Sequence, residues 1–325
     1  MINRLLKTQI MYDKRLCRNK THTSIPFIKY EFQISKTMDD DRDNIEYICV
    51  DNHNLPTTVP FFYEGIKFNM IPCPTWNGRL FKILEPKDDM TGIDRSLVDV
   101  SIDQPFFLGE TEISIKLFES IYGERIVKIY NENSKSPMAG INFFECVFIC
   151  NELSIHYGIQ PYYALSNIKY EDENNCISTA EVKIIDKKGK GFRLPTVDEW
   201  LYAASIGGTL INYSSTYALN NVAWFSRQDP TKKISTIPPM DVAMKKPNEW
   251  GFYDMMGNVE EWCFVSNVTY PPARDGSNCQ ATIGGRSMDK MDKYPDNLNL
   301  ELGYYKKADP ASFGAYIGFR LAKNI

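Results

Sequence analysis

Apolar residues recur at helical spacing in three segments in the middle of the chain. In EISIKLFESIYGE, which starts at Glu112, one helix face carries Ile113, Leu117, Phe118 and Ile121. In INFFECVFICNELSIHYG the inward positions are Phe144, Val147, Phe148 and Leu153, with Asn142 as the N-cap and Gly158 as the stop. In GFRLPTVDEWLYAAS, Thr196 and Glu199 have the spacing of a capping box, in which each side chain satisfies a backbone N–H. The pattern therefore predicts three helices.

Strand-like alternation surrounds these helices. It appears before them in GIKFNMIPCP, from Gly65, and over residues 99–114. After Gly208 no long helical period returns, and short strand candidates lie in NNVAWFS, VEEWCFV and IGFRLA. A few helices between short strands indicate an α+β fold with a loop-rich second half.

Residues 1–58 differ in texture from the rest. Leu5, Leu6, Ile10 and Met11 have near-helical spacing, which predicts a short helix. FIKYEFQISK alternates like a hairpin strand, and an acidic turn is expected at residues 38–44. No motif in this segment carries chemistry. We predict an N-terminal extension for packing or docking over residues 1–58 and the main domain over residues 59–325.

Composition narrows the possible partners. The chain has 325 residues and a formal net charge of −4, which gives no electrostatic footprint for binding nucleic acid. It has no run of 18 apolar residues, so no membrane span is predicted. The first residues lack the apolar core of a secretory signal, so we expect a cytoplasmic protein, with export by a signal-less route as the alternative.

Cysteine and histidine usage argues against a soft-metal centre. The eight cysteines are expected to be free thiols, and they are Cys17, Cys49, Cys73, Cys146, Cys150, Cys176, Cys263 and Cys279. None forms CxxC, and Cys146 and Cys150 are spaced like two buried thiols on one helix face. The only histidines are His22, His53 and His156, which are widely separated in the sequence.

The segment GFYDMMGNVEEWC, residues 251–263, is the densest cluster of candidate ligands. Asp254, Gly257, Val259 and Glu261 fall within eight residues around a Gly-Asn turn. Carboxylates and exposed carbonyls are the oxygen ligands that calcium prefers. The alternative is that Asp254 and Glu261 hydrogen-bond the turn while Trp250 and Trp262 fill the core.

Several segments taken together resemble the formylglycine-generating enzyme family, also called sulfatase-modifying factor domains. They occur in family order, and the most specific are RLPT-x-x-EW and NEWGFYDMMGNVEEW, within a resemblance that covers roughly residues 60–325. The resemblance implies a single C-type-lectin-like domain, with a twisted antiparallel sheet, a few helices and much irregular structure.

The family also implies calcium. Asp254, Gly257, Val259 and Glu261 match positions that bind calcium in the family through two side chains and two backbone carbonyls. A second family site implies Asn221 near the NxAW segment, with Asp241 or Asp229 as the acid. Calcium is therefore the expected cofactor, in a structural role.

The family's chemistry needs residues that this chain lacks. Formylglycine generation uses a copper(I)-binding cysteine pair late in the domain, but no cysteine follows Cys279. A related branch uses a three-histidine iron site with an H-x-x-x-E-x-H pattern, which is also missing. We expect neither copper nor iron.

Two functions remain. The first is a non-catalytic, lectin-like binding or scaffolding protein that presents the loop-rich surface of residues 264–318 to a protein or glycan. In some family members the corresponding region is diversified by a retroelement. The predicted contact residues are of types that often anchor interfaces, namely Tyr270, Arg274, Arg286, Asp289, Tyr294, Asn297, Tyr304, Tyr305 and Tyr316. The alternative is an oxidoreductase of altered mechanism that uses Cys263 or Cys279 as a lone thiol, or a metal held by carboxylates.

Overall fold

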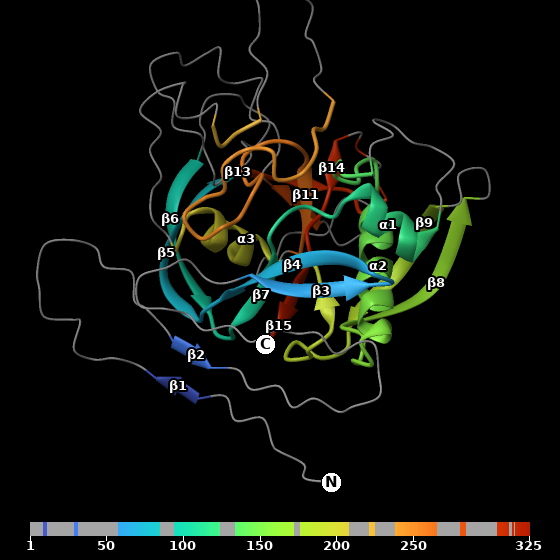
Figure 1. Cartoon of the computed structure of the whole chain (residues 1–325), viewed down its shortest axis with the longest axis horizontal. Helices are drawn as coiled ribbons and strands as arrows, with labels where there is room; N and C mark the ends of the chain where they lie inside the picture. Colours follow the sequence, from blue (N-terminus) through green and yellow to red (C-terminus); the bar gives the residue numbers. More distant parts are fainter. Residues whose placement is uncertain are drawn as a thin grey trace, which may run out of the picture.

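The computed structural model describes most of the chain from residue 58 onward (Figure 1). The described ranges are 9–11, 29–31, 58–84, 94–123, 134–171, 176–207, 221–224, 238–264, 280–283, 304–311, 314 and 316–325. The predicted surface residues 270, 274, 286, 289, 294 and 297 lie outside these ranges.

Five antiparallel strands form the sheet that contains the last strand of the chain. Their order is β10-β15-β7-β4-β3. The strands are β3 (Val59–Tyr63), β4 (Ile66–Cys73), β7 (Phe106–Gly109), β10 (Phe192–Arg193) and β15 (Ala322–Asn324). This sheet therefore joins the two ends of the main domain.

A second sheet contains six strands in the order β14-β11-β12-β13-β5-β6. They are β5 (Trp76–Leu84), β6 (Asp94–Ile102), β11 (Glu260–Cys263), β12 (Gln280–Ile283), β13 (Tyr304–Ala308) and β14 (Ile317–Gly318). Two of its pairings, β11 with β14 and β13 with β5, are parallel. The single antiparallel sheet expected from the sequence is thus divided into two sheets, one of them mixed.

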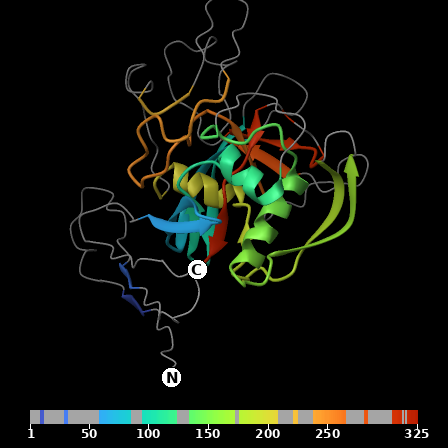
Figure 2. The ribbon, with the colours of Figure 1, turned by 45° about the vertical axis from the view of Figure 1, so that its right-hand side comes forward.

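Two hairpin-like pairs lie outside these sheets. Strands β8 (Tyr163–Glu171) and β9 (Cys176–Ile184) project beside helix α2 (Figure 2). Strands β1 (Gln9–Met11) and β2 (Lys29–Glu31) pair with each other. The helix expected around Ile10 and Met11 is therefore wrong at these two positions, because strand pairing replaces a short helix that would be marginal on its own.

The three predicted helices are confirmed. They are α1 (Ile115–Tyr122), α2 (Phe143–His156) and α3 (Val197–Ala204). Asn142 caps α2 in a reciprocal box with Glu145, and Thr196 caps α3 with Glu199. None of the helices in the described ranges has the length and hydrophobicity needed to cross a membrane.

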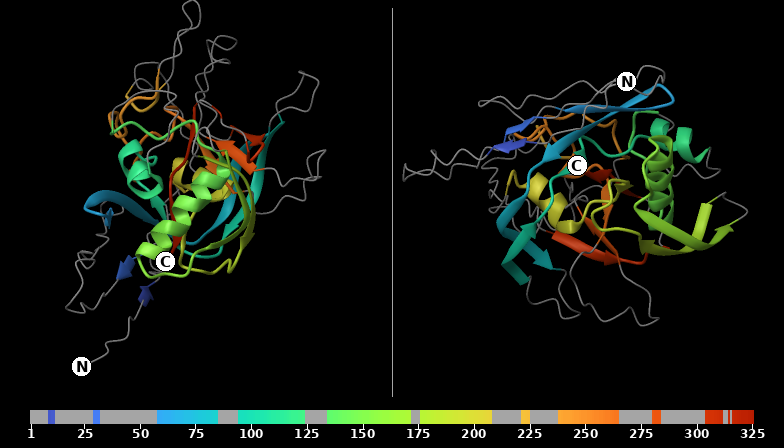
Figure 3. Two further views of the ribbon diagram at one scale, coloured as in Figure 1. Left: turned by 90° about the vertical axis from the view of Figure 1, so that its right-hand side faces the viewer. Right: turned by 90° about the horizontal axis from the view of Figure 1, so that it is seen from below.

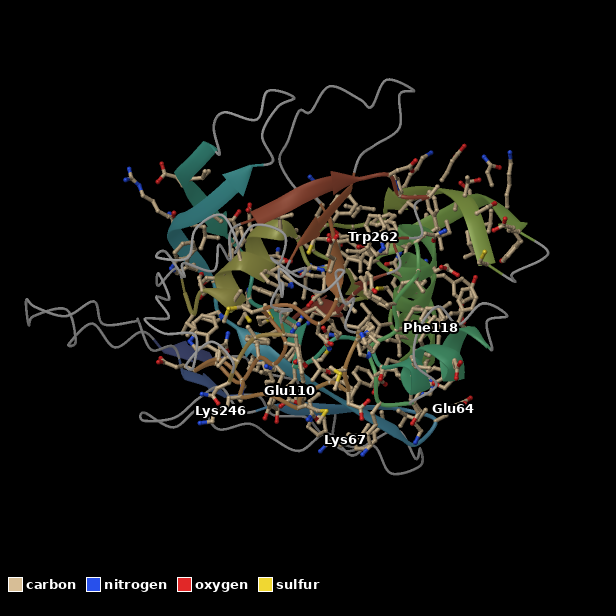
Figure 4. The ribbon with its side chains drawn as sticks, turned by 90° about the horizontal axis from the view of Figure 1, so that it is seen from above. Glu64, Lys67, Glu110, Phe118, Lys246 and Trp262 are labelled. Atoms are coloured by element: carbon tan, nitrogen blue, oxygen red, sulfur yellow. The ribbon has the colours of Figure 1, made fainter. Side chains whose placement is uncertain are left out.

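The five-stranded sheet has a hydrophobic core on each face. Along β4, Met70 belongs to the core built around α1 and α2, whereas its neighbour Ile71 belongs to the core built around α3. Strand β11 alternates in the same way, with Trp262 in the first core and Cys263 in the second. In Figure 4 the Trp262 side chain lies among packed side chains, while Lys67 and Glu64 lie along one margin.

The outer edge of β3 is closed by a side chain from the end of α2. The Phe62 N–H donates to the Tyr157 hydroxyl at 2.6 Å, and that hydroxyl donates to the Phe62 carbonyl at 2.8 Å. Burial raises the pKa of Tyr157 to about 12, so the hydroxyl keeps its proton. Both backbone groups of this edge residue are therefore satisfied.

The α+β fold with few helices is confirmed, and one strand candidate is not. Within NNVAWFS, residues 221–224 form a turn and coil, and the Trp224 N–H donates to the Met256 carbonyl at 2.9 Å. The apolar residues of this segment suggested a strand, but Trp224 instead packs over the turn at Gly257.

Candidate functional site

The GFYDMMGNVEEWC segment forms a buried turn that leads into β11. Asp254, Gly257 and Asn258 have φ angles of 56°, 94° and 62°, in the left-handed region. A Cβ atom on Gly257 would clash with the Trp224 carbonyl oxygen. Glycine is therefore required there by backbone conformation and by space.

Glu261 is held in a completely buried ion pair. Arg320 donates from Nε to Glu261 Oε2 and from a terminal nitrogen to Oε1, both at 2.6 Å. The Trp200 indole N–H donates to the same Oε2 at 2.8 Å. Glu261 and Arg320 are both 0% exposed. This carboxylate, which was a predicted calcium ligand, is thus neutralised by the chain's own guanidinium.

Asp254 lies in the same cluster but makes different contacts. Its Oδ1 accepts from the Trp224 indole N–H at 3.1 Å, and its Oδ2 accepts from the Ala243 backbone N–H at 2.8 Å. Burial is the main cause that raises the pKa of Asp254, against the lowering effect of these hydrogen bonds and of Arg320. Asp254 therefore fixes the turn to two neighbouring segments.

Glu112 adds a third buried acid to this cluster. It is 2% exposed, its Oε2 accepts from the Asn258 amide at 3.2 Å, and its Oε1 has no hydrogen-bond partner among the described residues. Burial, followed by the charges of Asp254 and Glu261, raises the pKa of Glu112 well above its usual range. A single guanidinium, that of Arg320, thus lies near three buried acids. Protonation of Glu112 lowers the excess negative charge of this cluster.

These contacts do not fit a calcium ion at the first predicted site. Both oxygens of Glu261 point to Arg320, and both oxygens of Asp254 accept N–H groups. Within the described ranges, no group of three or more His, Cys, Asp or Glu side chains is arranged to hold a metal ion. Calcium through Asp254, Gly257, Val259 and Glu261 stays a prediction for experiment. The alternative is met only in part, because both carboxylates accept hydrogen bonds, but from other segments of the chain and not from within the turn.

The second predicted site is divided between separate contacts. The Asn221 carbonyl accepts from the Lys246 N–H at 2.8 Å, and Asp241 Oδ1 accepts from the Ser136 hydroxyl at 2.9 Å. Asp229 lies outside the described residues. This second site also stays a prediction.

The thiols within the described ranges are buried and, as predicted, form no disulfide bond there. They are Cys73, Cys146, Cys150, Cys176 and Cys263. Burial and the nearby Glu261 raise the pKa of Cys263 well above its usual value. The His156 ring lies against the Tyr63 ring with centroids 4.6 Å apart and planes tilted by 43°, and the other two histidines lie outside the described ranges.

The predicted surface of residues 264–318 includes the two long segments that connect β11 to β12 and β12 to β13. Consecutive strands here are antiparallel, so the 263–280 connection leaves one end of β12 and the 283–304 connection leaves the other. Tyr270 and Arg274 belong to the first connection, and Arg286, Asp289, Tyr294 and Asn297 to the second. At about 3.3 Å per residue the four-residue β12 separates these exits by roughly 10 Å.

Three of the predicted tyrosines lie within the described ranges, in or next to the strands that border this surface. Tyr304 and Tyr305 are in β13, opposite Ile83 and Leu84 of β5. Tyr316 is half-buried, and its carbonyl accepts from the Glu260 N–H at 2.8 Å. Their role in binding stays a prediction.

Arg320, Glu112 and Trp200 are the site residues that the sequence pattern did not identify as partners. Each lies far along the chain from the turn, between 59 and 146 residues from the atom it contacts. The only signal was indirect, because an arginine within the apolar run IGFRLA must find an acid when it is buried.

The fold and the cluster define a class of protein: a single α+β domain of the formylglycine-generating type, whose signature turn is held by buried polar contacts. The chain belongs to the family of sulfatase-modifying factor enzyme 1-like domains, whose model matches residues 88–325.

Similar proteins span this family. The chain is 30% identical over 235 residues to the chaperone protein LppX of Paenibacillus barcinonensis, covering 67% of this chain and 80% of LppX. It is 29% identical over 134 residues to the inactive C-alpha-formylglycine-generating enzyme 2 of Mus musculus, covering 35% of this chain and 42% of that protein. Among solved structures, Treponema denticola variable protein 1 matches with a TM-score of 0.60 and 23% identity, over 83% of this chain and all of that one.

Proposed function

We propose that this protein is a non-catalytic binding or scaffolding domain that holds a polypeptide partner on the surface of residues 264–318. The observation that carries the proposal is the state of Cys263. Its side chain is completely buried, and its pKa is raised by burial and by Glu261. A thiolate is needed for nucleophilic or copper chemistry, and this position disfavours it.

The names of two relatives favour a binding function over catalysis for this chain. One is named as an inactive member of the family, and another is named as a chaperone. A chaperone acts on polypeptides, so we place a polypeptide ahead of a glycan as the ligand.

The topology divides the proposed surface into two parts. The exits of the two long connections lie roughly 10 Å apart along β12, which is within the width of a standard protein interface. One extended partner can therefore contact both parts. The tyrosine and arginine side chains on them would supply rigid aromatic area and bidentate hydrogen bonds.

A binding assay on the full chain tests this proposal. The probes are reduced, carboxymethylated lactalbumin, which is an unfolded polypeptide, and an immobilised glycan array. Variants carry Tyr270→Ala with Arg274→Ala, or Arg286→Ala with Tyr294→Ala, and Lys183→Ala on the exposed side of β9 is the control. We expect the polypeptide to bind, with affinity at least about tenfold weaker in one double variant and unchanged in the control.

The competing function is an altered oxidoreductase that uses Cys279, which lies outside the described residues, or Cys263. Metal analysis of the purified chain, together with oxygen consumption on cysteine-containing peptides, separates the two. Stoichiometric copper or iron with turnover would overturn the binding proposal. Binding of glycans but not of the polypeptide would replace the proposed partner.

A further inference from the structure

Residues 238–246 form a segment that is neither helix nor strand, and the buried turn before β11 fixes its backbone. The Met240 N–H donates to Asn258 Oδ1 at 2.9 Å, and the Asn258 amide donates back to the Met240 carbonyl at 3.2 Å. Further along, the Ala243 N–H donates to Asp254 Oδ2 at 2.8 Å. Side chains of the turn thus hold this segment at two points.

An unfavourable backbone conformation precedes the most exposed apolar side chain of this segment. Ala243 has a φ angle of 59°, in the left-handed region that alanine rarely adopts. Met244, which follows it, is 61% exposed, more than any other large apolar side chain in the described ranges. Backbone strain that surrounding contacts maintain is frequent at binding sites. The outlier at Ala243 therefore points to a function for the exposed Met244.

An aromatic ring fixes the lysine next to Met244. The Lys245 Nζ lies 4.2 Å from the centroid of the Trp224 ring, within the range of a cation–π interaction. The Trp224 indole is itself held, because its N–H donates to Asp254 Oδ1 at 3.1 Å. Lys246 follows and is exposed. One apolar side chain and two ammonium groups therefore lie within three consecutive residues.

This segment adjoins one part of the proposed binding surface. Ile283, where the 283–304 connection leaves β12, is opposite Glu261 near the start of β11. Asn258, which holds the segment, lies only three residues before Glu261, a span of at most about 10 Å. In the left view of Figure 3 the segment, drawn in orange, lies at the end of the domain away from the C-terminus. A polypeptide that contacts the 283–304 connection can therefore also reach residues 238–246.

We propose that Met244, Lys245 and Lys246 form a preformed contact for an acidic segment of a polypeptide, an inference that rests on the proposed function. The Met244 side chain packs against an apolar side chain of the partner, and the two ammonium groups pair with its carboxylates. Methionine suits partners of varied sequence because its side chain is unbranched and polarizable. Since the backbone is already fixed, binding orders few groups of this chain, and the two like charges select an acidic partner.

The charge preference is tested with two forms of one unfolded polypeptide. Reduced lactalbumin is alkylated either with iodoacetate, which adds a carboxylate to each cysteine, or with iodoacetamide, which adds a neutral amide. We expect the full chain to bind the carboxylate form severalfold more tightly at low salt. Lys245→Gln with Lys246→Gln should abolish this preference. Lys116→Gln with Lys183→Gln, at exposed positions on α1 and β9, should keep it.

The apolar contact is tested at Met244. Met244→Ala should weaken binding of both forms about fivefold, and Met244→Leu should restore most of the affinity because it keeps the apolar volume. Ile155→Ala on α2, where the side chain is 57% exposed, is the matched control and should leave binding unchanged. Thermal unfolding midpoints measured in parallel should stay equal, since both side chains lie on the surface.

Unchanged binding by Met244→Ala would overturn this inference, and so would a preference for the carboxylate form that survives the loss of both lysines. Either result leaves the proposed function to its own double variants in residues 264–318. Conversely, weaker binding by Met244→Ala, with unchanged binding by those double variants, would support this contact and contradict the proposed surface. Binding of neither form of lactalbumin would contradict both proposals.

Discussion

Arg320 and Glu261 form a two-bond ion pair from which water is completely excluded, between β11 and the segment that joins β14 to β15. Arg320 also donates to the Gly109 and Tyr253 carbonyls. A single guanidinium thus connects β7, the signature turn and β11.

Removing this guanidinium should destabilise the protein strongly. Arg320→Met leaves Glu261 buried without its cation, and we expect a loss of about 3 to 5 kcal/mol in the free energy of unfolding, measured by urea denaturation. Arg79→Met is the control, because Arg79 pairs with Asp99 at 3.1 Å on the surface, where pairs contribute about 1 kcal/mol or less. Similar losses in the two variants would contradict the structure.

Glu112 should make the protein less stable as the pH rises. Its raised pKa means that the folded state keeps a proton that the unfolded chain releases, so stability falls as the pH rises above about 4.5. Glu112→Gln keeps the shape without the titration. We expect this variant to be more stable than the parent at pH 8, by about 1 to 2 kcal/mol, with a flatter profile from pH 5 to 8.

Denaturation at several pH values measures this effect, with Glu64→Gln at an exposed position as the control. If the Glu112→Gln variant has a profile as steep as that of the parent, Glu112 does not carry the proton.

Calcium should have little effect on thermal unfolding. Arg320 already neutralises Glu261, and Asp254 accepts hydrogen bonds from two N–H donors, so both carboxylates of the predicted site are engaged by the chain's own groups. We expect equal unfolding midpoints in excess chelator and in millimolar calcium, measured by calorimetry. A rise of several degrees with calcium would favour the predicted site over the geometry described here.

Two glycines with positive φ should respond differently to alanine. Gly257→Ala adds a methyl group where a Cβ would meet the Trp224 carbonyl, whereas a Cβ on Gly65 would meet nothing within 4 Å. Both variants incur backbone strain of about 1 kcal/mol, and Gly257→Ala should lose roughly 3 kcal/mol or more because its neighbour is backbone. The free energy of unfolding of both variants is measured by chemical denaturation. Their difference gives the cost of the clash with the Trp224 carbonyl.

The helices could be predicted because their signals are local. Asn142 with Glu145, and Thr196 with Glu199, are three residues apart, and the structure forms both caps. The signature turn was also identified, but its meaning depended on distant partners. Trp200 lies 61 residues from Glu261, and Arg320 lies 59 residues from it.

The calcium prediction rests on the spacing of residues along the chain. Spacing brings Asp254 and Glu261 together but says nothing about the arginine that reaches Glu261 from the segment after the neighbouring strand β14. The division into two sheets was hidden for the same reason, since the pairing of β13 with β5 joins residues more than 200 positions apart.

The hydroxyl of Tyr157 has a consequence for assembly. It occupies both the donor and the acceptor of Phe62, and Pro60, two positions earlier on the same strand, has no N–H to offer. A strand from another molecule would find no complete backbone pair at Phe62 with which to extend the five-stranded sheet. The Tyr157 hydroxyl thus blocks edge-to-edge pairing of two copies of the protein at β3, so any self-association would have to use another surface.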